Sequence, residues 1–245
     1  MSASQPLRRA LVTGGSGDLG SAISHALALG GYHVIVHGHH GLTRAEAVAA
    51  AIRASGGSAQ AIAFDVTDAA AARSALDGLL AAGSIHAVVN NAGIHDDAPM
   101  AGMRGEQWQR VIDVSLQGFF NVTQPLLLPM ARARFGRIVS IGSIAAQLGN
   151  RGQTNYAAAK AALVGASKSL AREMASRGVT VNVVAPGVIA GRMADAAFPP
   201  ERIRDVVPAQ RAGTPEEVAA LVAFLCSDLA GYINGQVIGI NGGMG

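Results

Sequence analysis

Short apolar runs alternate with longer alanine-rich stretches along almost the whole chain. The short runs are rich in β-branched residues and apolar at nearly every position, which is typical of strands buried on both faces of a sheet. We predict seven of them as strands: Ala10–Thr13, Tyr32–His37, Ala59–Asp65, Ala87–Asn90, Arg137–Ile141, Thr180–Ala185 and Gln236–Ile240. The stretches between them have the length of helices, and we predict six: Leu19–Gly30, Thr43–Ser55, Ala69–Ala82, Gln107–Ala133, Asn155–Ser176 and Pro215–Ser227.

Strand and helix follow one another without a repeat or a linker, which predicts parallel strands joined by helical crossovers. We interpret residues 1–245 as a single α/β domain of Rossmann type, a doubly wound, seven-stranded parallel sheet with helices on both faces. The least regular segment is Val188–Gln210, which lies between a predicted strand and a predicted helix. A segment at that place in such a sheet covers a ligand site, so we predict a lid at about 188–210.

Composition narrows the class of protein. Hydrophobic residues make up 50% of the chain, which excludes a disordered protein. The single cysteine, Cys226, excludes a disulfide scaffold and a cysteine-rich zinc site. No apolar run approaches the roughly 18 residues of a membrane span, and the first residues lack the apolar core of a signal peptide. We therefore expect a cytoplasmic protein, and its net charge of +3 leaves room for a local basic patch rather than a nucleic-acid-binding tail.

A glycine-rich loop joins the first predicted strand to the first predicted helix, in the sequence Thr13–Gly20. Such a cluster also fits an ordinary tight turn, but its place at the start of a βαβ series favours binding of a dinucleotide diphosphate at the helix N-terminus. We predict that the cofactor contacts Gly14, Ser16, Gly17, Asp18, Leu19 and Gly20.

The end of the second strand indicates which cofactor binds. A site for NAD usually has a carboxylate about 20 residues beyond the loop, bound to the ribose hydroxyls. The segment Val36–His40 holds no carboxylate, and Arg44 is close by. This favours the 2′-phosphate of NADP(H), and we assign His37 to the cofactor site. The neighbouring histidines are interpreted as a polar loop, and no metal site is predicted.

Tyr156 and Lys160 are spaced i, i+4 on a predicted helix and so share one face. Such a pair also occurs by chance on a surface helix. A nearby ammonium lowers the pKa of a phenol, which is otherwise near ~10. Ser143 follows the preceding strand and can donate a hydrogen bond to a carbonyl. Beside a nicotinamide, these three residues would supply a proton donor, an ammonium that tunes it and a hydroxyl that polarises the carbonyl, as carbonyl reduction requires.

The motifs together resemble the short-chain dehydrogenase/reductase family over essentially the whole chain. Its pattern is matched by the glycine loop, Asn90-Asn91-Ala92-Gly93, Ser143, Tyr156-Ala157-Ala158-Ala159-Lys160 and Pro186-Gly187. Within the family the chain is most similar to the β-ketoacyl-[acyl carrier protein] reductases (FabG-type), through the segments Gly149–Lys160, Ser167–Pro186 and Tyr232–Met244. Variants in the first and last segments resemble reductases of type II polyketide or aryl-polyene systems.

The resemblance implies roles for individual residues. Tyr156 would protonate the reduced ketone oxygen, Lys160 would also hold the nicotinamide ribose, and Ser143 would orient the ketone. The remaining contacts to the cofactor would come from Asp65, Val66, Asn90, Asn91, Ala92, Gly93, Pro186, Gly187 and Ile189.

The resemblance also implies partners. Family members are usually tetramers built on two long helices, here about Asp113–Arg132 and Thr154–Ser176. We expect a homotetramer or a hetero-oligomer with a related subunit. Arg134 and Arg177 align with residues that dock the acyl carrier protein, although two solvated arginines remain the alternative.

Three positions depart from the family pattern. Asp18 stands where the family has glycine, and a carboxylate there would repel a diphosphate unless it pointed outward. Ser115 stands in place of the catalytic asparagine that holds a helix kink and a water of the proton relay. Gly191 stands where a threonine usually contacts the carboxamide. We predict slower turnover or a rearranged relay from Ser115.

The leading hypothesis is NADPH-dependent reduction of a 3-oxoacyl thioester on acyl carrier protein, in fatty acid or polyketide biosynthesis. One alternative is an enzyme of the same fold acting on a free alcohol or ketone, since fold alone does not fix the substrate. The other is a binding or scaffold subunit with weak turnover, which Asp18 and Ser115 motivate and the intact Ser143, Tyr156 and Lys160 oppose.

Overall fold

The computed structural model describes residues 7–39, 42–191 and 200–245. These residues form a seven-stranded sheet in the order β3-β2-β1-β4-β5-β6-β7, and every neighbouring pair is parallel. The strands are β1 (Arg8–Val12), β2 (Tyr32–Gly38), β3 (Ser58–Ala63), β4 (Ala87–Asn90), β5 (Gly136–Ile141), β6 (Val179–Pro186) and β7 (Val237–Ile240). The chain builds outward from β1 to β3 and then returns to β4, so the order reverses between β1 and β4. Ligands bind at this point in open α/β sheets, beyond the carboxyl ends of the strands.

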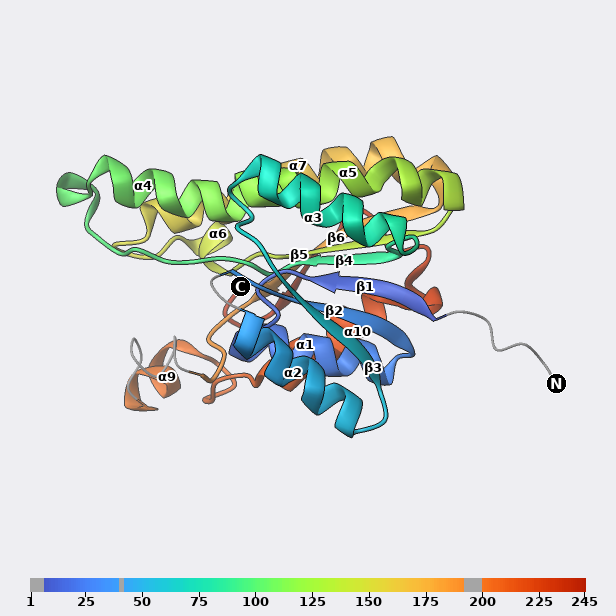
Figure 1. Cartoon of the computed structure of the whole chain (residues 1–245). Helices are drawn as coiled ribbons and strands as arrows, with labels where there is room; N and C mark the ends of the chain where they lie inside the picture. The colour runs from blue at the N-terminus through green and yellow to red at the C-terminus, as the bar shows by residue number, and fades with distance from the viewer. Residues whose placement is uncertain (1–6, 40–41, 192–199) are drawn as a thin grey trace.

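Helices cover both faces of the sheet, as Figure 1 shows. One layer contains α3 (Ala69–Ala81), α5 (Gly118–Ala133) and α7 (Thr154–Met174), and the other contains α1 (Asp18–Leu29), α2 (Leu42–Ala54) and α10 (Pro215–Cys226). Each layer encloses its own apolar core against the sheet. The central strands are buried along their whole length, which explains their continuous apolarity. The predicted fold is confirmed.

Shorter helices gather at the edge where the strands end, at the left of Figure 1. They are α4 (Gly105–Ile112), α6 (Ala145–Leu148) and α9 (Pro200–Val206). Short 3₁₀ segments occur at Met100–Gly102, Ala175–Arg177 and Asp228–Ala230. The predictions above include none of these as separate elements.

The long helix predicted at Gln107–Ala133 is divided in the structure. A π-helical turn, Asp113–Gln117, separates α4 from α5 and holds Ser115 in a buried position. π-turns insert one residue into a helix and often mark functional sites. The turn lies against α7, which carries the predicted proton donor.

Part of the predicted lid lies outside the described residues, at 192–199. The described remainder includes Ile189, which bridges to Gly213, and α9. Val188 and Val207 form a small apolar cluster there. No helix in the described part of the chain is long and apolar enough to cross a membrane.

Candidate cofactor and active site

In the glycine loop between β1 and α1, backbone atoms pack so closely together that a side chain would not fit between them. Gly14 has φ +62°, in the left-handed region that favours glycine. A Cβ on Gly20 would lie 2.2 Å from the carbonyl oxygen of Gly14. The loop therefore packs backbone against backbone, and both glycines are required for this conformation.

The segment after β4 holds the loop from one side. Thr13 Oγ1 accepts hydrogen bonds from the backbone N–H groups of Asn91 and Ala92, each at 3.0 Å. The Asn91 side chain donates to the carbonyl oxygens of Thr13 (2.9 Å) and Gly14 (3.1 Å). Asn91 therefore acts on the cofactor site by shaping the loop, whereas Asn90 is buried and donates to Thr123 Oγ1 at 3.0 Å.

His37 holds the loop from behind. Its Nδ1 accepts a hydrogen bond from the Gly14 N–H at 3.1 Å, and its Nε2 therefore carries the proton and donates to the Phe64 carbonyl at 2.8 Å. Burial lowers the pKa of His37 to about 4, so the ring is neutral near pH 7. The ring is 1% exposed. This geometry gives His37 a supporting role behind the loop, and its direct contact with the cofactor stays a prediction.

The start of α1 fits a diphosphate. Its N-cap residue, Gly17, supplies no side-chain hydrogen bond to the first turn. The N–H groups of that turn thus lack a side-chain cap, and such groups bind anions. Ser16 is half-buried, and Leu19 packs against the core beneath the helix. Asp18 is exposed, and its carboxylate lies beside Gly191, where a built Cβ would be 3.3 Å from Oδ2.

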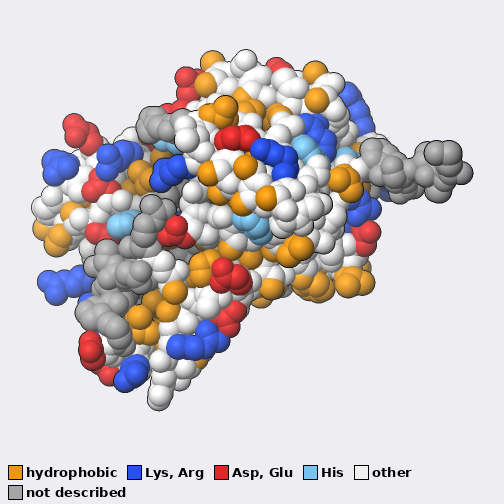
Figure 2. Space-filling view, turned by 60° about the horizontal axis from the view of Figure 1, so that its bottom comes forward, with side chains coloured by type: hydrophobic (Ala, Val, Ile, Leu, Met, Phe, Trp, Pro, Cys, Tyr) orange, Lys and Arg blue, Asp and Glu red, His pale blue; other side chains and the backbone are white. Residues whose placement is uncertain are grey.

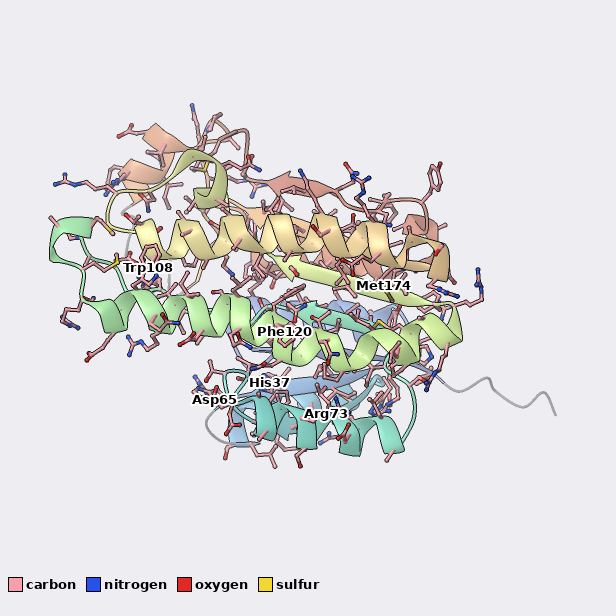
Figure 3. The ribbon with its side chains drawn as sticks, turned by 90° about the horizontal axis from the view of Figure 1, so that it is seen from above. His37, Asp65, Arg73, Trp108, Phe120 and Met174 are labelled. Atoms are coloured by element: carbon pink, nitrogen blue, oxygen red, sulfur yellow. The ribbon has the colours of Figure 1, made fainter. Side chains whose placement is uncertain are left out.

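Asp65 and Val66 lie at the end of β3, near His37 (Figure 3). Asp65 Oδ1 accepts hydrogen bonds from the N–H and hydroxyl groups of Thr67, each at 2.8 Å, and Oδ2 lies 3.2 Å from Nε2 of His39. Partial burial raises the pKa of Asp65, but the bonds from Thr67 and His39 outweigh it, and the net pKa is lowered. Val66 is buried, and its carbonyl accepts from Asn121 at 2.9 Å.

Ser143, Tyr156 and Lys160 meet beyond the ends of β5 and β6. The Ser143 hydroxyl accepts from the Ala145 N–H at 3.1 Å and lies close enough to the Tyr156 phenol to lower its pKa. Lys160 donates to the Ile141 carbonyl at 2.8 Å, and its Nζ lies 5.5 Å from the centre of the Tyr156 ring. Gly93 leaves room for this ammonium, because a Cβ there would lie 3.3 Å from Nζ.

The pKa of Tyr156 differs from the expectation from sequence. Burial raises the pKa of Tyr156 above its ordinary value, the nearby Ser143 hydroxyl lowers it, and the carboxylate of Asp97 raises it. The predicted lowering by Lys160 is not found, because burial dominates and the ammonium is directed at the Ile141 carbonyl. Burial also lowers the pKa of Lys160 to about 8. Tyr156 is therefore a protonated phenol at neutral pH, which suits a proton donor.

Two residues were missed by the sequence reasoning, Asn155 at the start of α7 and Asp97 in the loop after β4. Asn155 is fully buried; its side chain donates to the carbonyls of Asp96 and Gln107, each at 3.0 Å, and accepts from the Tyr156 N–H at 2.8 Å. Asp97 accepts a hydrogen bond from Gln153 at 2.8 Å. No motif signals these roles, since they depend on the loop after β4 meeting the turn before α7.

Ser115 is 3% exposed, and among the described residues its hydroxyl has no hydrogen-bond partner. Buried hydroxyls usually have one, so this position has capacity for a water or another polar group. Ser115 lies within the π-helical turn, where the family's asparagine would hold a kink.

The chain leaving β6 forms the opposite wall of the site. Pro186 ends the strand, and Gly187 packs so closely on Asn241 that a Cβ would lie 2.8 Å from Asn241 Cα. Ile189 pairs with Gly213 and so is held in place.

Arg134 and Arg177 lie together at the opposite end of the helical layer. Both are exposed, and Arg134 donates to the Ser176 carbonyl at 3.2 Å. No group of three or more His, Cys, Asp or Glu residues among those described could hold a metal ion.

Comparison with known proteins gives a consistent result. A family model described as "Enoyl-(Acyl carrier protein) reductase" matches residues 16–245. The chain is 44% identical over 236 residues to 3-oxoacyl-[acyl-carrier-protein] reductase FabG of Aggregatibacter actinomycetemcomitans, covering 96% of this chain and 98% of that protein. It is 45% identical over 239 residues to the same-named protein of Escherichia coli K12, covering 96% of each. For that of Staphylococcus aureus Mu50 the identity is 42%, covering 97% and 98%.

A solved structure shares the fold at high similarity. The crystal structure of a proposed gluconate dehydrogenase from Agrobacterium tumefaciens superposes with a TM-score of 0.93 at 33% identity, covering 97% of this chain and 95% of that one. Sequence and structure therefore point to the same group of proteins.

Proposed function

Because this chain belongs to the short-chain dehydrogenase/reductase family, we propose that it reduces the 3-oxo group of an acyl thioester on acyl carrier protein to the 3-hydroxy group, with NADPH. The observation that carries the proposal is the convergence of Ser143, Tyr156 and Lys160 beyond the ends of β5 and β6, at the edge that also holds the glycine loop. The reaction belongs to fatty acid or polyketide assembly in the cytoplasm.

The roles of the three residues follow from their contacts. The Ser143 hydroxyl lies close enough to the Tyr156 phenol to lower its pKa, so both can be directed at one ketone oxygen. Tyr156 holds the proton that this oxygen receives, and the raised pKa keeps it there at neutral pH. Bound NADPH supplies the hydride to the β-carbon. Lys160 is fixed by Ile141 beside Gly93, where the nicotinamide ribose would lie.

The preference for NADPH rests on the end of β2. His39 is about half-exposed there and pairs with Asp65, and Arg44 is exposed on α2. These groups can neutralise a 2′-phosphate, while a carboxylate directed at the ribose is absent from the described end of β2. Asp65 lies nearby, but its oxygens are already engaged by Thr67 and His39.

The carrier protein would dock at Arg134 and Arg177. Acyl carrier protein is acidic, and these two cations lie next to each other at the ends of α5 and α7. Elsewhere, on the face shown in Figure 2, acidic and basic side chains are interspersed over the described residues.

One alternative has a specific observation in its favour. The likeness to a proposed gluconate dehydrogenase supports a free alcohol or ketone as substrate. A weakly active scaffold would fit Asp18 and Ser115, but it would have no need of Ser143, Tyr156 and Lys160 gathered at one place.

The test is consumption of NADPH with a 3-oxoacyl thioester, free and on carrier protein, beside NADH and a Tyr156→Phe control. We expect turnover with NADPH, at least a hundredfold loss in Tyr156→Phe, and a higher kcat/KM on the carrier. Equal rates on free and carrier-bound ketones would favour the free substrate. Tight NADPH binding without turnover would point to a different ketone, and no binding to the scaffold.

A further inference from the structure

The Gly187–Gly191 segment, which follows β6, connects the two halves of the candidate site. Just before it, the Pro186 carbonyl accepts a hydrogen bond from the Ile144 N–H at 2.8 Å, next to the predicted catalytic serine. At its end, Gly191 lies beside Asp18 at the start of α1, where the diphosphate would bind. A dinucleotide that reaches from the glycine loop to the proton donor must therefore pass along this segment.

The turn Arg211–Thr214, just before α10, holds the segment in place. The Gly213 N–H donates to the Val188 carbonyl at 2.9 Å, and the Gly213 carbonyl accepts from the Ala190 N–H at 2.8 Å. Ile189 forms a parallel bridge with Gly213, and its Cδ1 lies 2.9 Å from the place where a Cβ on that glycine would stand. One residue of the turn thus fixes three consecutive residues of the segment.

An ion pair holds the turn itself. Nη1 and Nη2 of Arg211 donate to Oε2 and Oε1 of Glu217 at 2.8 Å and 2.6 Å, a bidentate arrangement. Oε2 also accepts from the Thr214 N–H at 2.8 Å, so the carboxylate is bonded to residues on both sides of Gly213. The bonds from Arg211 and Thr214 lower the pKa of Glu217 to about 2, and the carboxylate is charged at neutral pH.

Side chains fill the space between the turn and the segment incompletely. A cavity of about 90 Å³ lies there, and its lining includes Val188, Gly213, Glu217, Ile240 and Asn241. The chain also enters the turn through Gln210 at φ +56°, a left-handed conformation that is uncommon for a residue with a Cβ. On the cavity side, the position of Gly213 therefore depends on the ion pair rather than on packed side chains.

We propose that Glu217 is a positioning residue, which through Arg211 and the turn holds Val188–Ala190 against the nicotinamide half of the dinucleotide. The inference rests on the cofactor of the proposed function and not on its ketone substrate. The side chains of Arg211 and Glu217 are 59% and 41% exposed, and exposed ion pairs contribute little to the free energy of unfolding. Loss of the pair should therefore change cofactor binding with little change in the melting temperature.

The test compares two ligands that differ by the nicotinamide ring. NADPH and 2′-phospho-ADP-ribose share the phosphorylated adenosine, the diphosphate and the second ribose, and only NADPH carries the nicotinamide. By calorimetry, we expect Glu217→Gln to bind NADPH about fivefold more weakly and 2′-phospho-ADP-ribose unchanged. The glutamine oxygen can still accept from the Thr214 N–H, so the start of α10 stays capped. If the original protein binds NADH in place of NADPH, NADH and ADP-ribose form the equivalent pair of ligands.

Arg211→Gln breaks the same pair from the other side. Glu217→Gln removes a negative charge and Arg211→Gln a positive one, so electrostatic attraction alone would shift the affinity for an anionic cofactor in opposite directions. We expect the same selective loss of about fivefold in both, and no further loss in the double variant, because all three variants break one interaction.

Thr214→Ala is the matched control. It keeps the ion pair and removes the hydrogen bond of 3.3 Å from the Glu217 N–H to Thr214 Oγ1, which caps α10. We expect a lower melting temperature and unchanged affinity for both ligands, since the loss of a cap destabilises a helix without moving Gly213.

The outcomes separate the two proposals. Equal losses for both ligands, additive losses in the double variant, or unchanged NADPH affinity in Glu217→Gln would overturn the role of Glu217 and leave the reductase proposal intact. Selective loss of NADPH affinity together with no turnover of any 3-oxoacyl thioester would uphold Glu217 and overturn the proposed substrate. A chain that binds neither NADPH nor NADH would overturn both.

Discussion

At the scale of the residue, His37 makes the free energy of unfolding depend on pH. The native ring is neutral because Nδ1 accepts from Gly14 and burial lowers the pKa from 6.5 to about 4. The unfolded chain takes up a proton below pH 6.5, so the free energy of unfolding falls as the pH is lowered from about 6.5 to about 4. The full effect is about 3 kcal/mol.

We expect urea unfolding at pH 7 and pH 4.5 to show this loss, and His37→Asn to show a smaller pH dependence. His25→Asn serves as the control, since His25 lies on α1 and is hydrogen-bonded to the Ser21 carbonyl. An unchanged pH dependence in His37→Asn would contradict the role of the ring.

Two substitutions of Ser115 test its contributions to stability and to activity separately. Its hydroxyl is buried without a partner in the described structure, so Ser115→Ala should leave the free energy of unfolding unchanged or raise it by about 1 kcal/mol. Ser115→Asn should raise kcat by about fivefold, equivalent to ~1 kcal/mol, if a longer amide holds the relay water better. Thermal melting and steady-state kinetics measure the two effects. No gain in rate for Ser115→Asn would leave the slow-relay hypothesis without support.

Sequence spacing identified Tyr156, Lys160 and Ser143, because an i, i+4 pair and a strand end fix where side chains lie. It did not show which way His37 faces, since the residue at the end of a buried strand can face the ligand or the core. The pKa of Tyr156 also required the fold, because burial outweighs the ammonium that the pattern suggested.

At the scale of the element, the start of α7 is tied to the loop after β4. Gln153 donates to Asp97, and Asn155 holds the carbonyls of Asp96 and Gln107. The carboxylate of Asp97 thereby stands near Tyr156 and contributes to its raised pKa.

Asp97→Asn should shift the alkaline limb of the kcat/KM profile to lower pH. The reduction needs protonated Tyr156, and removing the nearby negative charge lowers the pKa of its phenol, so activity is lost at a lower pH. Asp77→Asn is the control, since Asp77 lies on α3 and pairs with Arg73. A profile of Asp97→Asn that overlays that of Asp77→Asn would refute the electrostatic role.

The strands could be predicted from short runs of continuous apolarity, and the long helices from the length of the alanine-rich stretches between them. The four residues of α6 and the seven of α9 are too few for a period to be distinguished. The π-helical turn also escapes, because α4 and α5 continue the same helix on either side and the single inserted residue leaves the apolar pattern almost unchanged.

At the scale of the whole molecule, α5 and α7 lie side by side and form an outer surface of the helical layer (Figure 3). Phe120 and Leu128 of α5 are 57% and 67% exposed. Large exposed apolar side chains along one helix favour an interface, which supports the proposed tetramer. The same surface would fit a related subunit equally well, since a second copy of this chain and a related subunit would both present such helices.

The proposed docking residues and the active site lie at opposite ends of α7. Tyr156 is in its first turn and Arg177 follows its last, so about 30 Å separates them at 1.5 Å per residue. In a pair of copies related by a twofold axis perpendicular to α7, neighbouring α7 helices would run in opposite directions. The arginines of one copy then lie near the Tyr156 of the other, and a docked carrier would serve the partner's site.

This arrangement predicts complementation between two inactive variants. Tyr156→Phe and the double variant Arg134→Glu/Arg177→Glu should each lose most activity on a carrier-bound substrate, while the arginine variant keeps its rate on a free thioester. Co-expressed and purified as mixed oligomers, they should recover at least a quarter of the original carrier-dependent rate, because some sites combine an intact Tyr156 with the partner's intact arginines. Light scattering establishes the oligomeric state. If the mixed oligomer is no faster than the average of its parents, the carrier docks and reacts on the same copy. That result would refute docking on one copy with reaction in the other.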